Sequence, residues 1–138
     1  MESPDPSFRR RLLMEALTVL AADAQTQVTW LVRHAVMTDE IALDFDHSFR
    51  MAETLVAEGQ LARKVMADLQ EIDVILSGMS GGENADRWTR DALFTDEGWA
   101  LARRLARRVL EPLRVRWRID SLRGSSHGTS VPLSARAS

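Results

Sequence analysis

The 138-residue chain contains no cysteine. This absence excludes disulfide bonds, thiolate metal sites and cysteine nucleophiles, and it suits a reducing compartment. The sequence also lacks an apolar run long enough to cross a bilayer, and residues 1–6 have neither the basic start nor the apolar stretch of a signal peptide. We therefore expect a cytoplasmic protein with no membrane-embedded segment.

Lysine is almost absent as well, because Lys64 is the single lysine beside seventeen arginines. Such a bias is typical of GC-rich genomes and says little about function. The net charge is −2, but residues 38–60 carry six acids and one arginine, whereas residues 101–138 carry nine arginines and two acids. Segregation of this kind indicates charged partners rather than a particular fold.

The pattern of hydrophobic residues predicts a mainly α-helical protein. Hydrophobic residues make up 45% of the sequence, which is enough for one core in a chain of this length. Apolar side chains recur at helical spacing in stretches that begin near Ser7, Val28, Asp39, Leu61 and Thr95. We predict a small bundle of four to five amphipathic helices.

Capping residues and helix breakers set the expected boundaries. The triplet Thr-Asp-Glu at 38–40 and again at 95–97 places a hydroxyl before two acids, which suits a helix start. The helix after residue 38 is expected to end at about residue 57, ahead of Gly59. Pro112 is expected to end the last helix, and the glycine- and serine-rich residues 77–82 predict a loop.

Two segments leave helix and strand open. Residues 28–32 continue a helical apolar stripe but also contain strand-favouring side chains, and we prefer the helix. Residues 113–119 alternate apolar side chains with charged ones, a period of two that predicts a short C-terminal strand or extended arm. We therefore predict one helical domain over residues 1–119 and a disordered tail, rich in serine, glycine and alanine, over residues 120–138.

Residues 38–110 carry a resemblance to known proteins. The stretches TDEIALDFD at 38–46 and ENADRWT at 83–89 resemble those of small helical actinobacterial proteins of unassigned function. The resemblance covers about half of the chain. It implies a helical fold and a cytoplasmic location, and it transfers no catalytic residue.

Acidic and histidine side chains share one side of the helix expected after residue 38. Glu40, Asp44 and His47 are spaced i, i+4 and i+7, so they lie together opposite the apolar stripe. Two carboxylates and an imidazole are metal ligands, and Asp44 with His47 reproduces the carboxylate-x-x-His spacing of helical di-iron sites. Those sites take further ligands from other helices, and the sequence has no second motif of this type. A solvated acidic face is therefore the favoured interpretation, ahead of a metal-dependent hydrolase.

The arginine-rich C-terminal segment is the best candidate binding surface. Its members are Arg103, Arg104, Arg107, Arg108, Arg114, Arg116, Trp117 and Arg118. Guanidinium and indole side chains bind phosphates and stack on bases, and they also bind acidic protein surfaces. The pI of about 5.9 and the absence of a recognised nucleic-acid motif favour a protein partner over nucleic acid.

No complete catalytic or cofactor motif is present. The three histidines lie near no recognisable nucleophile motif, and the glycine-rich loop lacks the Lys-Ser/Thr ending of a phosphate-binding loop. We therefore predict a non-enzymatic helical module for protein interaction or self-association, homodimeric and without a cofactor. In that module an acidic patch around Glu40, Asp44 and Asp46 would pair with the arginine face of a second copy. An accessory nucleic-acid binder is the second prediction.

Overall fold

The computed structural model describes residues 6–127, with side chains described over residues 7–118. This part of the chain is mainly helical, as predicted, but it contains seven α-helices and one 3₁₀ helix rather than four to five helices. In chain order these are α1 (Pro6–Ala21), α2 (Ala24–His34), α3 (Asp39–Arg50), α4 (Ala52–Ala57), α5 (Arg63–Gly78), η1 (Gly82–Trp88), α6 (Arg90–Thr95) and α7 (Glu97–His127). Residues 28–32 lie within α2, so the helix prediction for them is confirmed.

The helix predicted from 39 to about 57 is divided into α3 and α4. Ser48 is buried, and its hydroxyl donates to the carbonyl of Phe45 at 3.0 Å. The backbone N–H of Met51 donates to the carbonyl of Ser48 at 3.1 Å, a bond of the 3₁₀ type that tightens the last turn of α3. The apolar pattern continues through this break, which is why the sequence predicts one helix where there are two.

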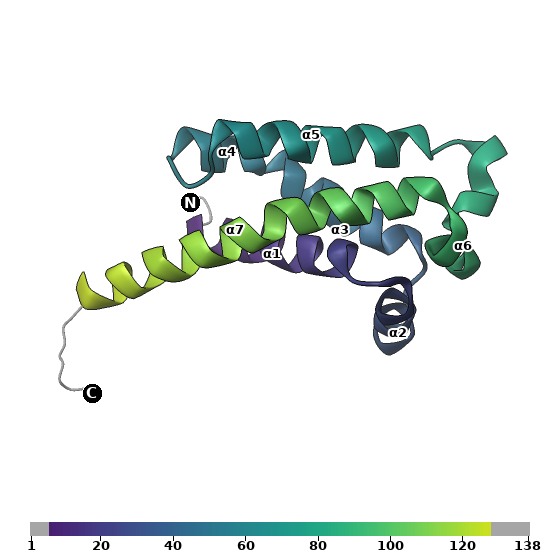
Figure 1. The fold of residues 1–138 in the computed structure, drawn as a ribbon, viewed down its shortest axis with the longest axis horizontal. Coiled ribbons are helices and arrows are strands. Elements are labelled where there is room, and N and C mark those ends of the chain that lie inside the picture. The colour runs from purple at the N-terminus through teal and green to yellow at the C-terminus, as the bar shows by residue number, and fades with distance from the viewer. Residues whose placement is uncertain (1–5, 128–138) are drawn as a thin grey trace, which may run out of the picture.

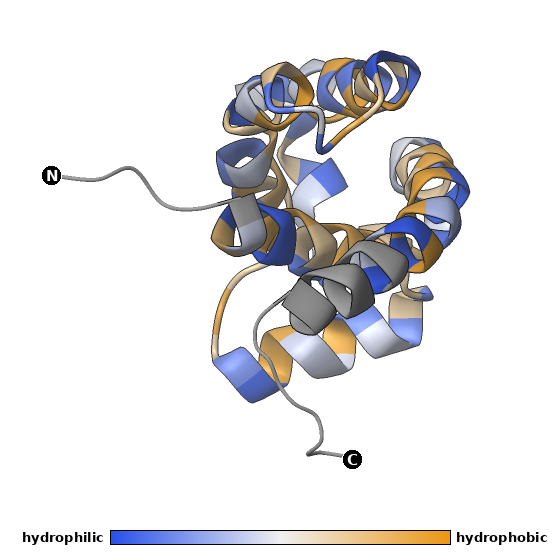
Figure 2. Ribbon diagram, turned by 90° about the vertical axis from the view of Figure 1, so that its left-hand side faces the viewer, coloured by the Kyte–Doolittle hydropathy of each residue, from blue (hydrophilic) through white to orange (hydrophobic). Residues whose placement is uncertain are grey.

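α7 runs along the length of the molecule and packs against both α1 and α5 (Figure 1). α1 also packs against α3, while α2 crosses the direction of the other long helices at one end of the bundle (Figures 1 and 2). Figure 2 shows hydrophobic and hydrophilic stretches alternating along each helix, as expected for amphipathic helices around one core. The largest fully buried side chains are Trp99, Phe45, Leu13, Leu17, Leu20, Leu31, Ile41, Leu55, Leu69, Ile72, Met79 and Leu93.

The predicted end of the last helix at Pro112 is wrong, and so is the strand or arm predicted beyond it. α7 continues through the proline as far as His127. Leu113 and Trp117 are only 2% and 7% exposed, whereas Val115 between them is 48% exposed. Burial at positions four apart follows the helical period, since a strand would have placed all three side chains on one face.

Packing explains why the helix tolerates the proline. Pro112 lies on the exposed side of α7 and costs it one backbone hydrogen bond, a penalty of about 3 kcal/mol in a helix interior. Burying Leu113 and Trp117 contributes about 2 kcal/mol each or more. Trp117 also donates its indole N–H to the carbonyl of Gln60 at 2.9 Å, and the guanidinium of Arg10 lies 5.7 Å from its ring. These contacts hold α7 against α1 and against the loop between α4 and α5.

Residues 120–127, which the sequence analysis assigns to the disordered tail, are helical backbone in α7. The rest of that predicted tail, residues 128–138, lies outside the described residues. None of the described helices combines the length and the apolar character that a membrane-spanning helix needs.

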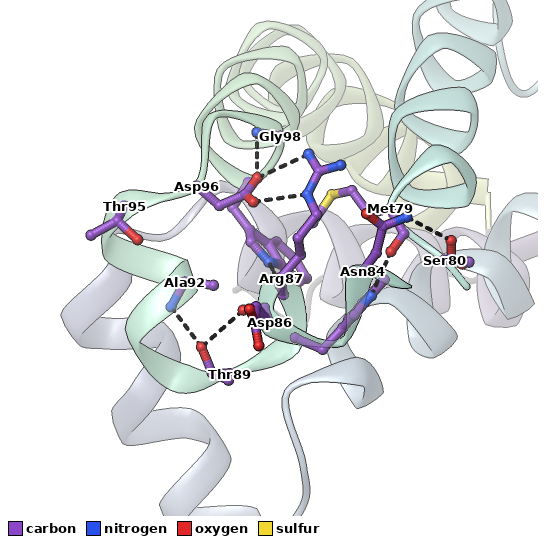
Figure 3. Close-up of polar contacts among 12 residues, drawn as sticks. Met79, Ser80, Asn84, Asp86, Arg87, Thr89, Ala92, Thr95, Asp96 and Gly98 are labelled. Atoms are coloured by element: carbon purple, nitrogen blue, oxygen red, sulfur yellow. Dashed lines mark hydrogen bonds and ion pairs between the residues drawn. The ribbon is translucent and has the colours of Figure 1, made fainter. Parts of the chain in front are cut away.

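A cluster of polar contacts closes the end of the bundle where η1, α6 and α7 meet (Figure 3). Arg87 donates to the carboxylate of Asp96 from Nε at 2.8 Å and from Nη2 at 3.2 Å. Asp96 also accepts the backbone N–H of Gly98 at 2.6 Å, so it satisfies a donor in the first turn of α7. The predicted helix start at 95–97 agrees with the start of α7 at Glu97, but Asp96 rather than Thr95 provides the cap. α6 has its own cap, the hydroxyl of Thr89.

Candidate functional site

The predicted binding residues of the arginine-rich segment all lie on α7, and their hydrogen bonds divide them into two groups. Arg103 donates from Nε to the carbonyl of Ala22 at 2.9 Å, and Arg107 donates from Nε to the carbonyl of Ala21 at 2.7 Å. Arg103 also donates from Nη2 to the carbonyl of Leu93 at 3.0 Å. Burial lowers the pKa of the Arg103 guanidinium, which stays charged at neutral pH. These two arginines therefore bind the end of α1 in their own chain.

Gln27 on α2 completes this cluster, although no motif in the sequence marks it. It is fully buried, and its Nε2 donates to the carbonyls of Val19 and Leu20, both at 3.1 Å. Side chains from α2 and α7 thus bond four consecutive carbonyls at the negative end of the α1 dipole. The one signal in the sequence is that Gln27 stands four residues before the apolar Leu31, on the side of α2 that faces the core.

Three further members of the predicted surface also contact their own chain. Arg108 donates to Asp68 of α5 at 2.9 Å, and Arg116 donates to the carbonyl of Gly59 at 2.9 Å. Trp117 is buried against Gln60, as described above.

The remaining arginines form an exposed ridge. Arg104 and Arg118 make no hydrogen bond or ion pair with other described side chains, and Arg114 lies 3.8 Å from Glu111. The helical period places these arginines and the exposed Val115 on the side of α7 that faces away from the core. We call these four residues, Arg104, Arg114, Val115 and Arg118, the α7 ridge.

A groove of about 470 Å³ lies between α3 and α5. Its lining combines apolar side chains with three carboxylates, from Asp39, Asp46 and Asp73. Met37 and Leu43 belong to the lining although they are 79% and 55% exposed. We call this feature the acidic groove.

The carboxylates of the acidic groove differ in their partners. Asp46 accepts from Nε of Arg50 at 2.8 Å, and this hydrogen bond raises the pKa of the guanidinium. Asp39 and Asp73 have no hydrogen bond or ion pair with any side chain that the structure describes. Arg50 also interacts electrostatically with Asp73, so Asp46 and Asp73 share one guanidinium among the described side chains, and the carboxylate of Asp39 has no hydrogen-bonded cation there.

Two of the three predicted metal ligands line the same pocket. Asp44 and His47 line a second pocket, of about 700 Å³, between α1, α2 and α3, and Glu40 is not part of its lining. Over residues 7–118, no three histidine, aspartate or glutamate side chains come close enough together to hold a metal ion. The helix spacing that suggested a metal site is present, but among the described residues no third carboxylate or imidazole lies close enough to Asp44 and His47 to complete a metal site.

The chain matches no protein-family model, and no curated protein and no solved structure matches it significantly. The resemblance to small helical actinobacterial proteins therefore stays a prediction. The α7 ridge, the acidic groove and the second pocket are the candidate functional surfaces of the described residues.

Proposed function

We propose that the chain is a helical self-association module in which the α7 ridge of one copy binds the acidic groove of another. The observation that carries the proposal is that one chain exposes two surfaces of opposite charge, with Val115 exposed on the basic one and Met37 and Leu43 on the acidic one. Opposite charge directs association and sets its register, and burial of the apolar side chains supplies affinity.

The acidic groove has the composition of a site for a basic helix. Met37 and Leu43 expose apolar surface that association would remove from water, at about 1–2 kcal/mol for each side chain. Asp39 and Asp73 stand beside them and have no hydrogen bond or ion pair with a described cation, although Arg50, which is bonded to Asp46, also attracts Asp73. An amphipathic helix that places an apolar side chain between two guanidinium groups would satisfy both features.

The α7 ridge has the complementary composition. Val115 is exposed between Arg114 and Arg118, on the outer side of the helix. The distal turns of α7 extend past the other helices of the bundle, so the backbone there is accessible to a second copy (Figure 1). A reciprocal arrangement would give a two-fold dimer with two identical contacts.

Charge reversal tests this proposal. The groove variant carries Asp39→Arg and Asp73→Arg, the ridge variant carries Arg114→Glu and Arg118→Glu, and native mass is measured by light scattering after size exclusion. The unmodified chain is expected to be a dimer that weakens with salt, and each variant is expected to be a monomer. Mixing the two variants in equal amounts should restore a dimer, because reversed ridge and reversed groove attract each other again.

The matched control reverses two exposed cations elsewhere, with Arg63→Glu and Lys64→Glu in the first turn of α5. This control should remain a dimer. A monomeric unmodified chain at low and high salt, or variants that remain dimeric, would contradict the proposal.

A second candidate function uses the same ridge to bind nucleic acid. It is favoured by the exposure of Arg104, Arg114 and Arg118, whose guanidinium groups are available to phosphates. Fluorescence anisotropy with labelled single-stranded DNA would test it, with binding that falls steeply as salt rises. No binding at low salt would eliminate this function.

A further inference from the structure

The second pocket gathers polar side chains from three helices. α1 contributes Arg11 and Glu15, α2 contributes Trp30 and His34, and α3 contributes Asp44 and His47. The rest of the lining comes from α1 and is apolar apart from Thr18, and the volume of about 700 Å³ suits a small organic ligand. We call it the histidine pocket, and it shares no residue with the α7 ridge or the acidic groove.

Trp30 differs from the other three tryptophans in its hydrogen bonding. Trp88, Trp99 and Trp117 donate their indole N–H to the carbonyls of Met79, Arg87 and Gln60, respectively. Trp30 is half-buried, and its N–H has no acceptor in the part of the chain that the structure describes. The tryptophan of the histidine pocket, Trp30, is thus the one whose indole N–H is left for solvent or a ligand.

His34 has a defined orientation beside this indole. The two ring centroids lie 4.5 Å apart, and Nδ1 of His34 lies 2.9 Å from the carbonyl oxygen of Trp30. Because a carbonyl only accepts, Nδ1 carries the hydrogen, and Nε2 of the neutral ring is left as an acceptor. The imidazole of His47 has no hydrogen-bond partner among the described residues.

The charges of the histidine pocket favour a cationic ligand. Glu15 and Asp44 contribute −2 and Arg11 contributes +1, which leaves −1 when both imidazoles are neutral. Neither carboxylate has a hydrogen bond or ion pair within the described side chains. The face of Trp30 is a further surface that attracts cations.

We infer that the histidine pocket binds a small protonated organic amine that carries an apolar body. The ammonium group lies at the carboxylates of Glu15 and Asp44, and the apolar body lies against Trp30 and the aliphatic side chains of α1. Binding removes apolar surface from water and gives the two carboxylates a cation.

Three probes with the same aromatic ring test the ligand class: phenethylamine as the cation, 2-phenylethanol as the neutral analogue and 3-phenylpropanoate as the anion. The readout is the indole N–H resonance of Trp30 in ¹H–¹⁵N spectra of the full chain, assigned by its loss in Trp30→Phe. Phenethylamine should give a saturable shift, and the other two probes should not. Glu15→Gln with Asp44→Asn should weaken phenethylamine binding by about tenfold or more.

The matched control removes two exposed carboxylates elsewhere, with Glu71→Gln and Asp86→Asn, and should leave the affinity unchanged. The inference is overturned if phenethylamine gives no saturable shift, if the alcohol or the carboxylate binds as tightly, or if the Glu15 and Asp44 variant keeps full affinity. A spectrum with the dispersion of the unmodified chain shows that each variant is folded.

Discussion

Arg103 on α7 donates from Nη2 to Oε1 of Gln27 on α2 at 2.8 Å. The same amide donates from Nε2 to the carbonyls of Val19 and Leu20, so Gln27 links Arg103 to the last turn of α1. Arg103, which the charge pattern assigns to a binding surface, thus connects α7 to α2, to α6 and to Ala22, the residue that follows α1. The two kinds of arginine on α7 can be separated by stability measurements.

Arg103→Ala is expected to lower the free energy of unfolding by about 2–4 kcal/mol, because it leaves buried carbonyl and amide oxygens without a donor. Arg104→Ala, one residue along the same helix, should change it by less than about 0.5 kcal/mol. Urea unfolding followed by circular dichroism measures both. Equal effects of the two substitutions would show that the bonds of Arg103 are not structural.

Gly98→Ala should destabilise the protein, although alanine favours helix over glycine. A Cβ at Gly98 would lie 2.7 Å from Sδ of Met79 and 2.8 Å from Nη2 of Arg87. We expect a loss of about 1–3 kcal/mol from this overpacking. Gly78→Ala, at the end of α5, meets no atom within 4 Å and should be neutral or stabilising, so opposite signs in thermal melts are the expected result.

Asp96 links stability to acid pH. The hydrogen bond from Arg87 and the backbone N–H of Gly98 hold the pKa of Asp96 below its usual value, against the opposing effect of burial. Because the folded pKa lies below the unfolded one, the stabilisation is complete above about pH 4 and disappears as pH falls through the folded pKa.

Asp96→Asn should therefore be less stable than the unmodified chain at neutral pH, with a difference that shrinks in acid. The stability of Arg87→Met should likewise depend less on acid pH than that of the unmodified chain, because the substitution removes the main cause of the lowered Asp96 pKa. Urea unfolding between neutral pH and about pH 2 measures this. Parallel stability curves for the three proteins would contradict the assignment.

Pro112→Ala should stabilise α7. The substitution restores a backbone donor in the middle of the helix, and alanine is the better helix former, so we expect a gain of about 1–3 kcal/mol. Urea unfolding would detect the gain. If residues 113–119 formed an extended arm instead, the substitution would leave stability almost unchanged and would raise the helix content of the folded protein.

The helical fold could be predicted from the sequence because its signals are local. Apolar periodicity identified the main helices, and it also placed residues 28–32 in a helix despite their strand-favouring side chains. The same local reasoning failed at Pro112 and at the break between α3 and α4. At Pro112 the burial of Leu113 and Trp117 outweighed the local pattern. At the break, the local hydrogen bonds of Ser48 and Met51 tighten the helix in a way that apolar periodicity does not reveal.

The sequence by itself determined the helical class, the segregation of acidic and basic residues, and the absence of cysteine chemistry. Only the tertiary structure decided which charged residues face solvent. Arg103 and Arg104 are adjacent and chemically identical in the sequence, yet Arg103 donates to three other segments of the chain and Arg104 is exposed. The physical reason is that the sequence gives the residue type but not its partners. An arginine becomes structural only where folding brings distant carbonyls, such as those at the end of α1, within hydrogen-bond distance.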